Sequence, residues 1–172
     1  MGTLRSRLTF DVVAGEIRDQ DRRYLLMRPD VLMGMLHELD ELTRLRVLRM
    51  MAASAARHGG RSVQAYISHM PAAELSGFMQ EASADLGWGA WRIEHQASSV
   101  ELTVVNSPFA QGYGAALHPV CAPIAGVFQA MASAVLGAPA AVEEVECAAM
   151  GRHAACRFIA TPAPVTTQDH LR

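Results

Sequence analysis

Hydrophobic and polar positions alternate along some stretches of the chain and recur at helical spacing along others. Residues 8–13 (LTFDVV) alternate like a strand, and the turn at Ala14-Gly15 that follows predicts an N-terminal hairpin. Alternating or β-branched character predicts further antiparallel strands in three segments, 88–95, 100–105 and 140–161. The last of these segments is expected to hold two strands joined by a turn that contains glycine.

Five segments show the apolar spacing or the end signals of helices. They cover residues 29–42, 43–58, 62–70, 71–86 and 120–136. In the first of them, one face carries Leu32, Met35, Leu36 and Leu39. The pair Gly59-Gly60 is expected to end the second helix, and Gly137 is expected to end the last.

The order of these elements is hairpin, helices, strands, helix and hairpin, without a repeat or a linker. This order predicts an α+β fold in which an antiparallel sheet packs against helices. A length of 172 residues with 51% hydrophobic content fits one core better than two. We therefore expect a single domain over residues 8–161, followed by a flexible polar tail over residues 162–172.

Charge and hydropathy exclude several classes of protein. The net charge is −2 and the chain has no long basic run, so we expect no direct nucleic-acid partner. The N-terminus has no signal-peptide pattern, which predicts a cytoplasmic protein. Residues 121–142 lack charged side chains, but the prolines in and beside this segment favour a buried core helix over a membrane span.

The three cysteines are the candidate chemistry of the chain. In the cytoplasm they should stay reduced. Cys121 is expected in the first turn of the helix over 120–136, where the helix dipole lowers the pKa of a thiol and favours the metal-binding thiolate. Cys147 and Cys156 fall on the two arms of the terminal hairpin, so the three sulfurs can converge. The alternative is that all three are small buried apolar side chains.

A closed tetrahedral zinc site needs a fourth ligand. The candidates are His118, Glu143, Glu144, Glu146 and His153. Regular strand alternation places Glu143, rather than Glu144, on the face of Cys147. The residues by themselves leave the choice of the fourth ligand open.

The segment 118–158 runs from a Pro-Val-Cys through a helix to a Val-Glu-Cys, a turn with glycine and a last Cys. It resembles the C-terminal half of the vinyl-4-reductase-type domain, a family that includes the ligand-sensing N-terminal domains of sigma-54-dependent activators of aromatic catabolism. The start of the chain and the stretches GWGAWRI and NSPFAQGYG are similar to the same domains, so the resemblance covers residues 8–161.

The resemblance implies a structural zinc ion, because these sensors hold zinc with three cysteines and one glutamate. The matching positions are Cys121, Glu144, Cys147 and Cys156. Glu144 would need a β-bulge or a strand end to turn toward Cys147. The interval between Cys147 and Cys156 is one residue longer than the common pattern of the sensors.

The resemblance also implies an internal pocket for a small hydrophobic ligand. The candidate lining residues are aromatic, namely Trp88, Trp91, Phe109, Tyr113 and Phe128. For each of them the alternative is simple core packing.

These features predict a stand-alone, zinc-containing sensor or carrier domain for an aromatic or tetrapyrrole-like ligand. The alternative is an accessory enzyme, similar to a vinyl reductase, of bacteriochlorophyll or aromatic metabolism, although the chain has no nucleotide-binding or nucleophile motif. The apolar stretch 25–39 suits the seam of a homodimer, and a core helix would explain the same pattern.

Overall fold

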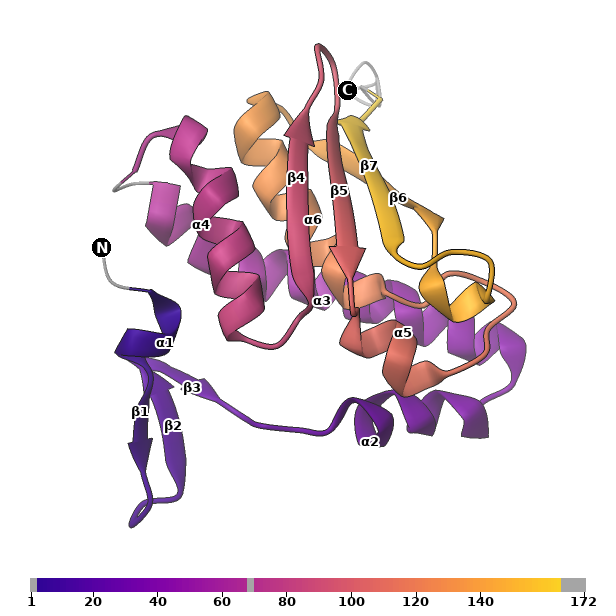
Figure 1. The fold of residues 1–172 in the computed structure, drawn as a ribbon, viewed down its shortest axis with the longest axis horizontal. Helices are drawn as coiled ribbons and strands as arrows, with labels where there is room; N and C mark the ends of the chain where they lie inside the picture. Colours follow the sequence, from indigo (N-terminus) through magenta and orange to yellow (C-terminus); the bar gives the residue numbers. More distant parts are fainter. Residues whose placement is uncertain (1–2, 68–69, 165–172) are drawn as a thin grey trace, which may run out of the picture.

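Two antiparallel sheets and a set of packed helices give the α+β fold that the sequence predicts (Figure 1). The structure is a computed structural model, and it describes residues 3–67 and 70–164. The helices are α1 (Leu4–Arg7), α2 (Pro29–Gly34), η1 (Met35–Glu38), α3 (Glu41–Ile67), α4 (Ala72–Asp85), α5 (Pro108–Tyr113), α6 (Ala122–Leu136) and η2 (Ala148–Met150). The strands are β1 (Thr9–Asp11), β2 (Glu16–Asp19), β3 (Arg22–Tyr24), β4 (Ala90–His95), β5 (Val100–Val105), β6 (Ala140–Glu146) and β7 (Cys156–Pro162).

The larger sheet has the strand order β4-β5-β7-β6, and each neighbouring pair is antiparallel. Alternate residues of β5 and β7 are buried, as expected for a sheet with one covered face. Helix α6 packs on that face, where the rings of Phe128 and Phe158 meet edge to face with centroids 6.4 Å apart. The strands predicted over 88–95, 100–105 and 140–161 are therefore confirmed within one or two residues.

Helix α3 continues through Gly59 and Gly60, so the expectation that these glycines end a helix is wrong. A Cβ atom on Gly59 would lie 2.9 Å from Cγ2 of Val127, and one on Gly60 would lie 3.2 Å from Cβ of Ala130, both on α6. Because these positions lack side chains, α3 and α6 can approach each other closely. This packing outweighs the low helix propensity of glycine. The helix expected over 62–70 is, as far as the structure describes it, the end of α3.

The predicted helix over 29–42 is divided into two short helices, α2 and η1. The break comes after η1, where the carboxylate of Asp40 caps the first turn of α3 with a hydrogen bond of 3.0 Å. Met33 and Leu36 are fully buried, whereas Met35 is 48% exposed. The placement of Met35 on the buried face is therefore wrong.

The predicted N-terminal hairpin gains a third strand and becomes the small sheet β1-β2-β3. Its edge strand β3 is joined to α2 by a strap, residues 25–28, which stands off the body of the molecule (Figure 1). The carboxylate of Asp19 is 1% exposed and is shared by Arg7 and Arg22, at 3.2 and 3.8 Å. The pair with Arg7 ties the small sheet to α1, and the pair with Arg22 joins β2 to β3.

The apolar segment 121–142 contributes α6 to the core, as expected from its prolines. Among the described residues, no helix combines the length and the apolar character that a membrane span requires. At the C-terminus, Pro162 still belongs to β7, and the predicted tail from residue 165 onward lies outside the described residues.

Candidate functional site

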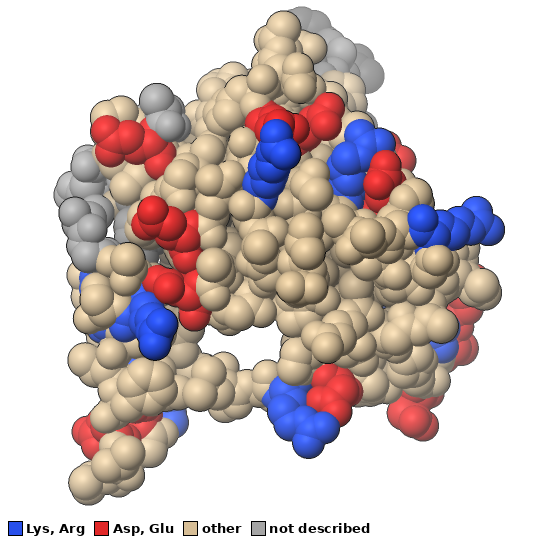
Figure 2. All heavy atoms as spheres, viewed as in Figure 1, with Lys and Arg blue, Asp and Glu red and all other residues tan. Residues whose placement is uncertain are grey.

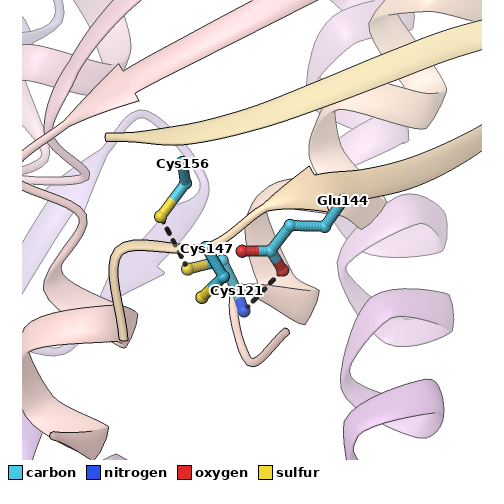
Figure 3. A group of neighbouring side chains, drawn as sticks. All are labelled: Cys121, Glu144, Cys147 and Cys156. Atoms are coloured by element: carbon cyan, nitrogen blue, oxygen red, sulfur yellow. Dashed lines mark hydrogen bonds between the residues drawn. The ribbon is translucent and has the colours of Figure 1, made fainter. Parts of the chain in front are cut away.

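Four side chains from separate segments converge where the terminal hairpin meets the start of α6 (Figure 3). Cys121 directly precedes α6, Glu144 lies on β6, Cys147 follows β6 and Cys156 begins β7. One ligand atom from each residue lies within 4.8 Å of the other three. The three cysteines carry free thiols and are fully buried. The structure thus brings together the four residues that the resemblance implied.

A β-bulge turns Glu144 toward the cysteines. In the pairing of β6 with β7, Glu144 lies opposite Phe158, but Glu146 lies opposite Arg157, so the register shifts between the two glutamates. Glu143, the residue that regular alternation favoured, is exposed. The bulge that Glu144 needs is therefore present, and the regular alternation that favoured Glu143 does not hold at this point of β6.

Hydrogen bonds satisfy this cluster only in part. Oε2 of Glu144 accepts the backbone N–H of Cys121 at 2.9 Å, which joins β6 to the start of α6. Sγ of Cys156 accepts the backbone N–H of Ala148 at 3.3 Å and lies 3.5 Å from Sγ of Cys121. Oγ of Ser107 lies 3.1 Å from the same sulfur of Cys121. Oε1 of Glu144 is buried without a hydrogen-bond partner among the described residues. A buried oxygen in this position is expected of a group that binds a ligand.

The buried groups cannot all be negative without a cation beside them. Hydrogen bonds with Cys121 and Cys147 lower the pKa of the Cys156 thiol to about 4. Hydrogen bonds with Cys147 and Cys156 raise the pKa of Cys121, so its thiol keeps its proton. Burial, and then the charge of Cys147, raises the pKa of Glu144 to about 8.

The predicted lowering of the Cys121 pKa by the helix is therefore wrong for the metal-free cluster. Cys121 is the N-cap residue of α6 rather than a residue of its first turn. The neighbouring sulfurs and the burial outweigh the helix dipole, because three ionisable groups compete for one buried space.

The donor set suits a structural zinc ion. Thiolates are preferred zinc ligands, and three thiolates with one carboxylate complete a tetrahedral coordination. A divalent cation would offset the charge that otherwise keeps Cys121 and Glu144 protonated, and it would give Oε1 of Glu144 a partner. Four protein ligands leave no open position for a reacting water, so the arrangement suits a structural role.

A cavity of about 370 Å³ lies between α3, α4, α6 and the edge of the N-terminal sheet. Its apolar wall includes Val63, Phe78, Met79, Trp88 and Val127. The volume falls within the range of small-molecule pockets, which are mostly apolar with a few polar groups. The cavity is therefore the candidate ligand site.

The five predicted pocket aromatics are distributed over three places. Trp88 lies in the wall of the 370 Å³ cavity, and Tyr113 lies in the wall of a smaller cavity of about 210 Å³. Trp91, Phe109 and Phe128 are at most 6% exposed and lie in the core, outside the walls of these two cavities. For these three residues the structure matches the alternative of core packing.

Sequence reasoning missed most of the cavity wall. Ala82 follows Phe78 by four residues and Met79 by three on α4. This spacing identifies one face of a helix but not what that face contacts. Arg22 and Arg23, which also line the cavity, belong to β3, which the predicted hairpin did not separate from β2. The wall comes from segments far apart in the chain, so only the fold reveals it.

Comparison with known proteins identifies the class to which this region is similar. The family model of the vinyl-4-reductase domain matches residues 100–162, the segment that holds all four side chains of the cluster. The resemblance to this family that the sequence predicted is therefore confirmed. The comparison with curated proteins gives no match.

Three solved structures share the fold. The phenol-responsive sensory domain of the transcription activator PoxR, solved with phenol, is 22% identical with a TM-score of 0.76, over 92% of this chain and 86% of that one. A vinyl-4-reductase family protein from Methanocaldococcus jannaschii is 15% identical with a TM-score of 0.51, over 82% and 98%. A trafficking protein particle complex subunit 3 from Naegleria fowleri, covalently bound to palmitic acid, is 10% identical with a TM-score of 0.54, over 78% and 89%.

Proposed function

We propose that this protein is a sensor or carrier domain that binds a small hydrophobic ligand in the 370 Å³ cavity and that a zinc ion fastens its C-terminal hairpin. The observation that carries the proposal is the convergence of Cys121, Glu144, Cys147 and Cys156 on one end of α6, the helix that also contributes Val127 to the cavity wall.

The zinc part of the proposal is supported by the chemistry of the cluster. Its ligand atoms lie within 4.8 Å of one another, and one buried oxygen of Glu144 has no hydrogen-bond partner among the described residues. In a closed site of this kind the binding energy of the metal contributes to folding. Zinc would hold the N-terminal end of α6 against the terminal hairpin.

The ligand part is supported by the cavity and by the fold. The sensory domain of PoxR, which shares this fold, is phenol-responsive. The cavity of this protein is lined mainly by apolar side chains of α3, α4 and α6. Val127 lies six residues after Cys121, about 9 Å along a helix, so a ligand in contact with Val127 touches the helix that the metal would anchor.

The ligand site can be tested with 2-naphthol, a neutral apolar probe, titrated by calorimetry. Ala82→Trp fills the cavity from α4 and should weaken binding by about tenfold or more, which corresponds to roughly 1.4 kcal/mol. Ala84→Trp is the matched control, because Ala84 is exposed on the same helix and outside the cavity wall. Equal affinity of the two variants would place the probe elsewhere and contradict the proposed site.

The alternative function is an accessory enzyme of pigment or aromatic metabolism. It requires an organic redox cofactor, since zinc with four protein ligands carries no redox or hydrolytic chemistry. Native mass spectrometry of the purified protein separates the two functions. One zinc ion with a small apolar ligand supports the sensor or carrier, and a bound redox cofactor supports the enzyme.

We also propose that the protein forms a homodimer through its N-terminal segment. Most exposed large hydrophobic side chains among the described residues belong to this segment, namely Phe10, Val12, Val13, Leu25, Leu26, Met27, Val31, Met35 and Leu42. Figure 2 shows an opening between the strap 25–28 and the body of the molecule. A second copy packed against the strap would remove this apolar surface from water.

A further inference from the structure

The 370 Å³ cavity is lined by two arginines and a histidine, and their charge has no acidic counterpart in the wall among the described residues. Arg22 and Arg23 come from β3 and His58 comes from α3, and among the residues that the structure describes the wall contains no aspartate or glutamate. The rest of the wall is apolar or neutral. A mostly apolar pocket with charge of a single sign selects its ligand by charge as well as by size.

The carboxylates that pair with these two arginines also pair with other arginines. Each of two carboxylates bridges two arginines: Asp19 bridges Arg7 and Arg22, and Glu16 bridges Arg18 and Arg23. Within these two groups, four guanidinium groups face two carboxylates. These two carboxylates therefore only partly offset the charge that Arg22 and Arg23 bring to the cavity wall.

His58, on α3, adds a hydrogen-bond donor to the cavity wall. Arg61 donates to Nδ1 of His58, which places the proton of the neutral ring on Nε2. His58 is exposed, and the side chain of Arg23 is 61% exposed. An anionic group at this mouth would keep part of its water shell, so it would pair with the basic side chains at a small desolvation cost.

We propose, resting on the ligand-binding function above, that the cavity takes a hydrophobic monocarboxylate. Its apolar body would lie among Phe78, Met79 and Val127, and its carboxylate would pair with Arg22 and Arg23 at the mouth. Arginine suits this role because its planar guanidinium matches the two oxygens of a carboxylate. A neutral ligand of the same shape would gain nothing from the charge of the mouth.

The test compares 2-naphthoate with 2-naphthol, two probes that share one apolar body and differ in charge at pH 7. Calorimetry on the wild-type protein should show that 2-naphthoate binds about tenfold tighter. The double variant Arg22→Gln, Arg23→Gln should lose this preference and keep its affinity for 2-naphthol. Arg18→Gln is the control, since Arg18 shares Glu16 with Arg23 but does not line the cavity.

Arg22 also pairs with the buried Asp19, so its substitution can destabilise the fold. A second variant that keeps Arg22 separates this effect from the effect on binding. Arg23→Gln alone should reduce the preference for 2-naphthoate by about threefold. One outcome overturns the carboxylate inference alone. In it, the wild-type protein binds 2-naphthol as tightly as 2-naphthoate, and Ala82→Trp weakens the binding of 2-naphthol, so the proposed function stands. If neither probe binds the wild-type protein, the proposed function fails and the inference fails with it.

Discussion

The contact between α3 and α6 depends on a glycine, and Gly126→Ala should destabilise the protein. A Cβ atom on Gly126 would lie 2.1 Å from the backbone oxygen of Ala52 and 2.9 Å from Cβ of Ala55, both on α3. The first of these atoms belongs to the backbone of another helix, so no side-chain rotation can relieve the overlap. The two helices would have to separate.

The size of the effect follows from two opposing contributions. Overpacking a core contact costs about 1–3 kcal/mol, and an overlap with backbone falls at the upper end of that range. Alanine in place of glycine in a helix returns about 1 kcal/mol. We therefore expect a net loss of about 2 kcal/mol in the free energy of unfolding.

Urea denaturation followed by circular dichroism measures this loss, with the slope of the transition checked for a change in mechanism. Gly77→Ala on α4 is the matched control, because a Cβ atom there meets no atom of the described residues within 4 Å. The control should gain about 0.5–1 kcal/mol. If Gly126→Ala stabilised the protein as the control does, the close approach of α3 and α6 would be refuted.

Three further predictions concern the metal and the dimer. Glu144→Gln should weaken zinc retention against a chelator by more than the roughly 10–100-fold typical of an outer-shell residue. Glu143→Gln, a change on the exposed face of β6, should leave zinc retention unchanged. A larger loss of zinc in Glu143→Gln than in Glu144→Gln would favour regular alternation. In the metal-free cluster the pKa of Glu144 is raised to about 8 and that of Cys121 is also raised, so zinc binding at pH 7 should release at least the protons of these two groups. The apparent affinity for zinc should accordingly decrease as the pH is lowered from about 8 to about 6. Calorimetry in two buffers of different ionisation enthalpy measures the protons released, and a binding enthalpy that is the same in both would contradict this prediction. Leu26→Glu, at a side chain 76% exposed on the strap, should shift the protein to a monomer in sedimentation experiments. Val105→Glu, at an exposed side chain on β5 of the larger sheet, should not.

The sequence predicts which helices and strands exist better than it predicts where each of them begins and ends. Residues 100–105 and 140–161 show the alternation of half-buried strands, and the structure follows it. At Gly59-Gly60 the local signal for a helix end is strong, but the contact with Val127 and Ala130 decides in favour of one long helix. Such a contact joins segments far apart in the chain, and local propensity carries no information about it.

The cluster and the cavity show the same limit. The positions of Cys121, Cys147 and Cys156 mark a candidate site. Regular alternation places Glu143 on the face of Cys147, but a bulge in β6 brings Glu144 to the cysteines instead. The resemblance supplied Glu144. The cavity wall was not predictable in this way, since Arg23 and Met79 come from separate layers that only tertiary packing brings together.

The most direct test of the account is the metal content of the purified protein and of Cys147→Ser, measured by elemental mass spectrometry together with the free energy of unfolding. The wild-type protein should hold one zinc ion per chain. The variant should lose most of it and should be less stable by several kcal/mol, because the metal contributes to folding. A wild-type protein that holds no zinc after exposure to it, or a variant of unchanged stability, would contradict a metal-fastened hairpin.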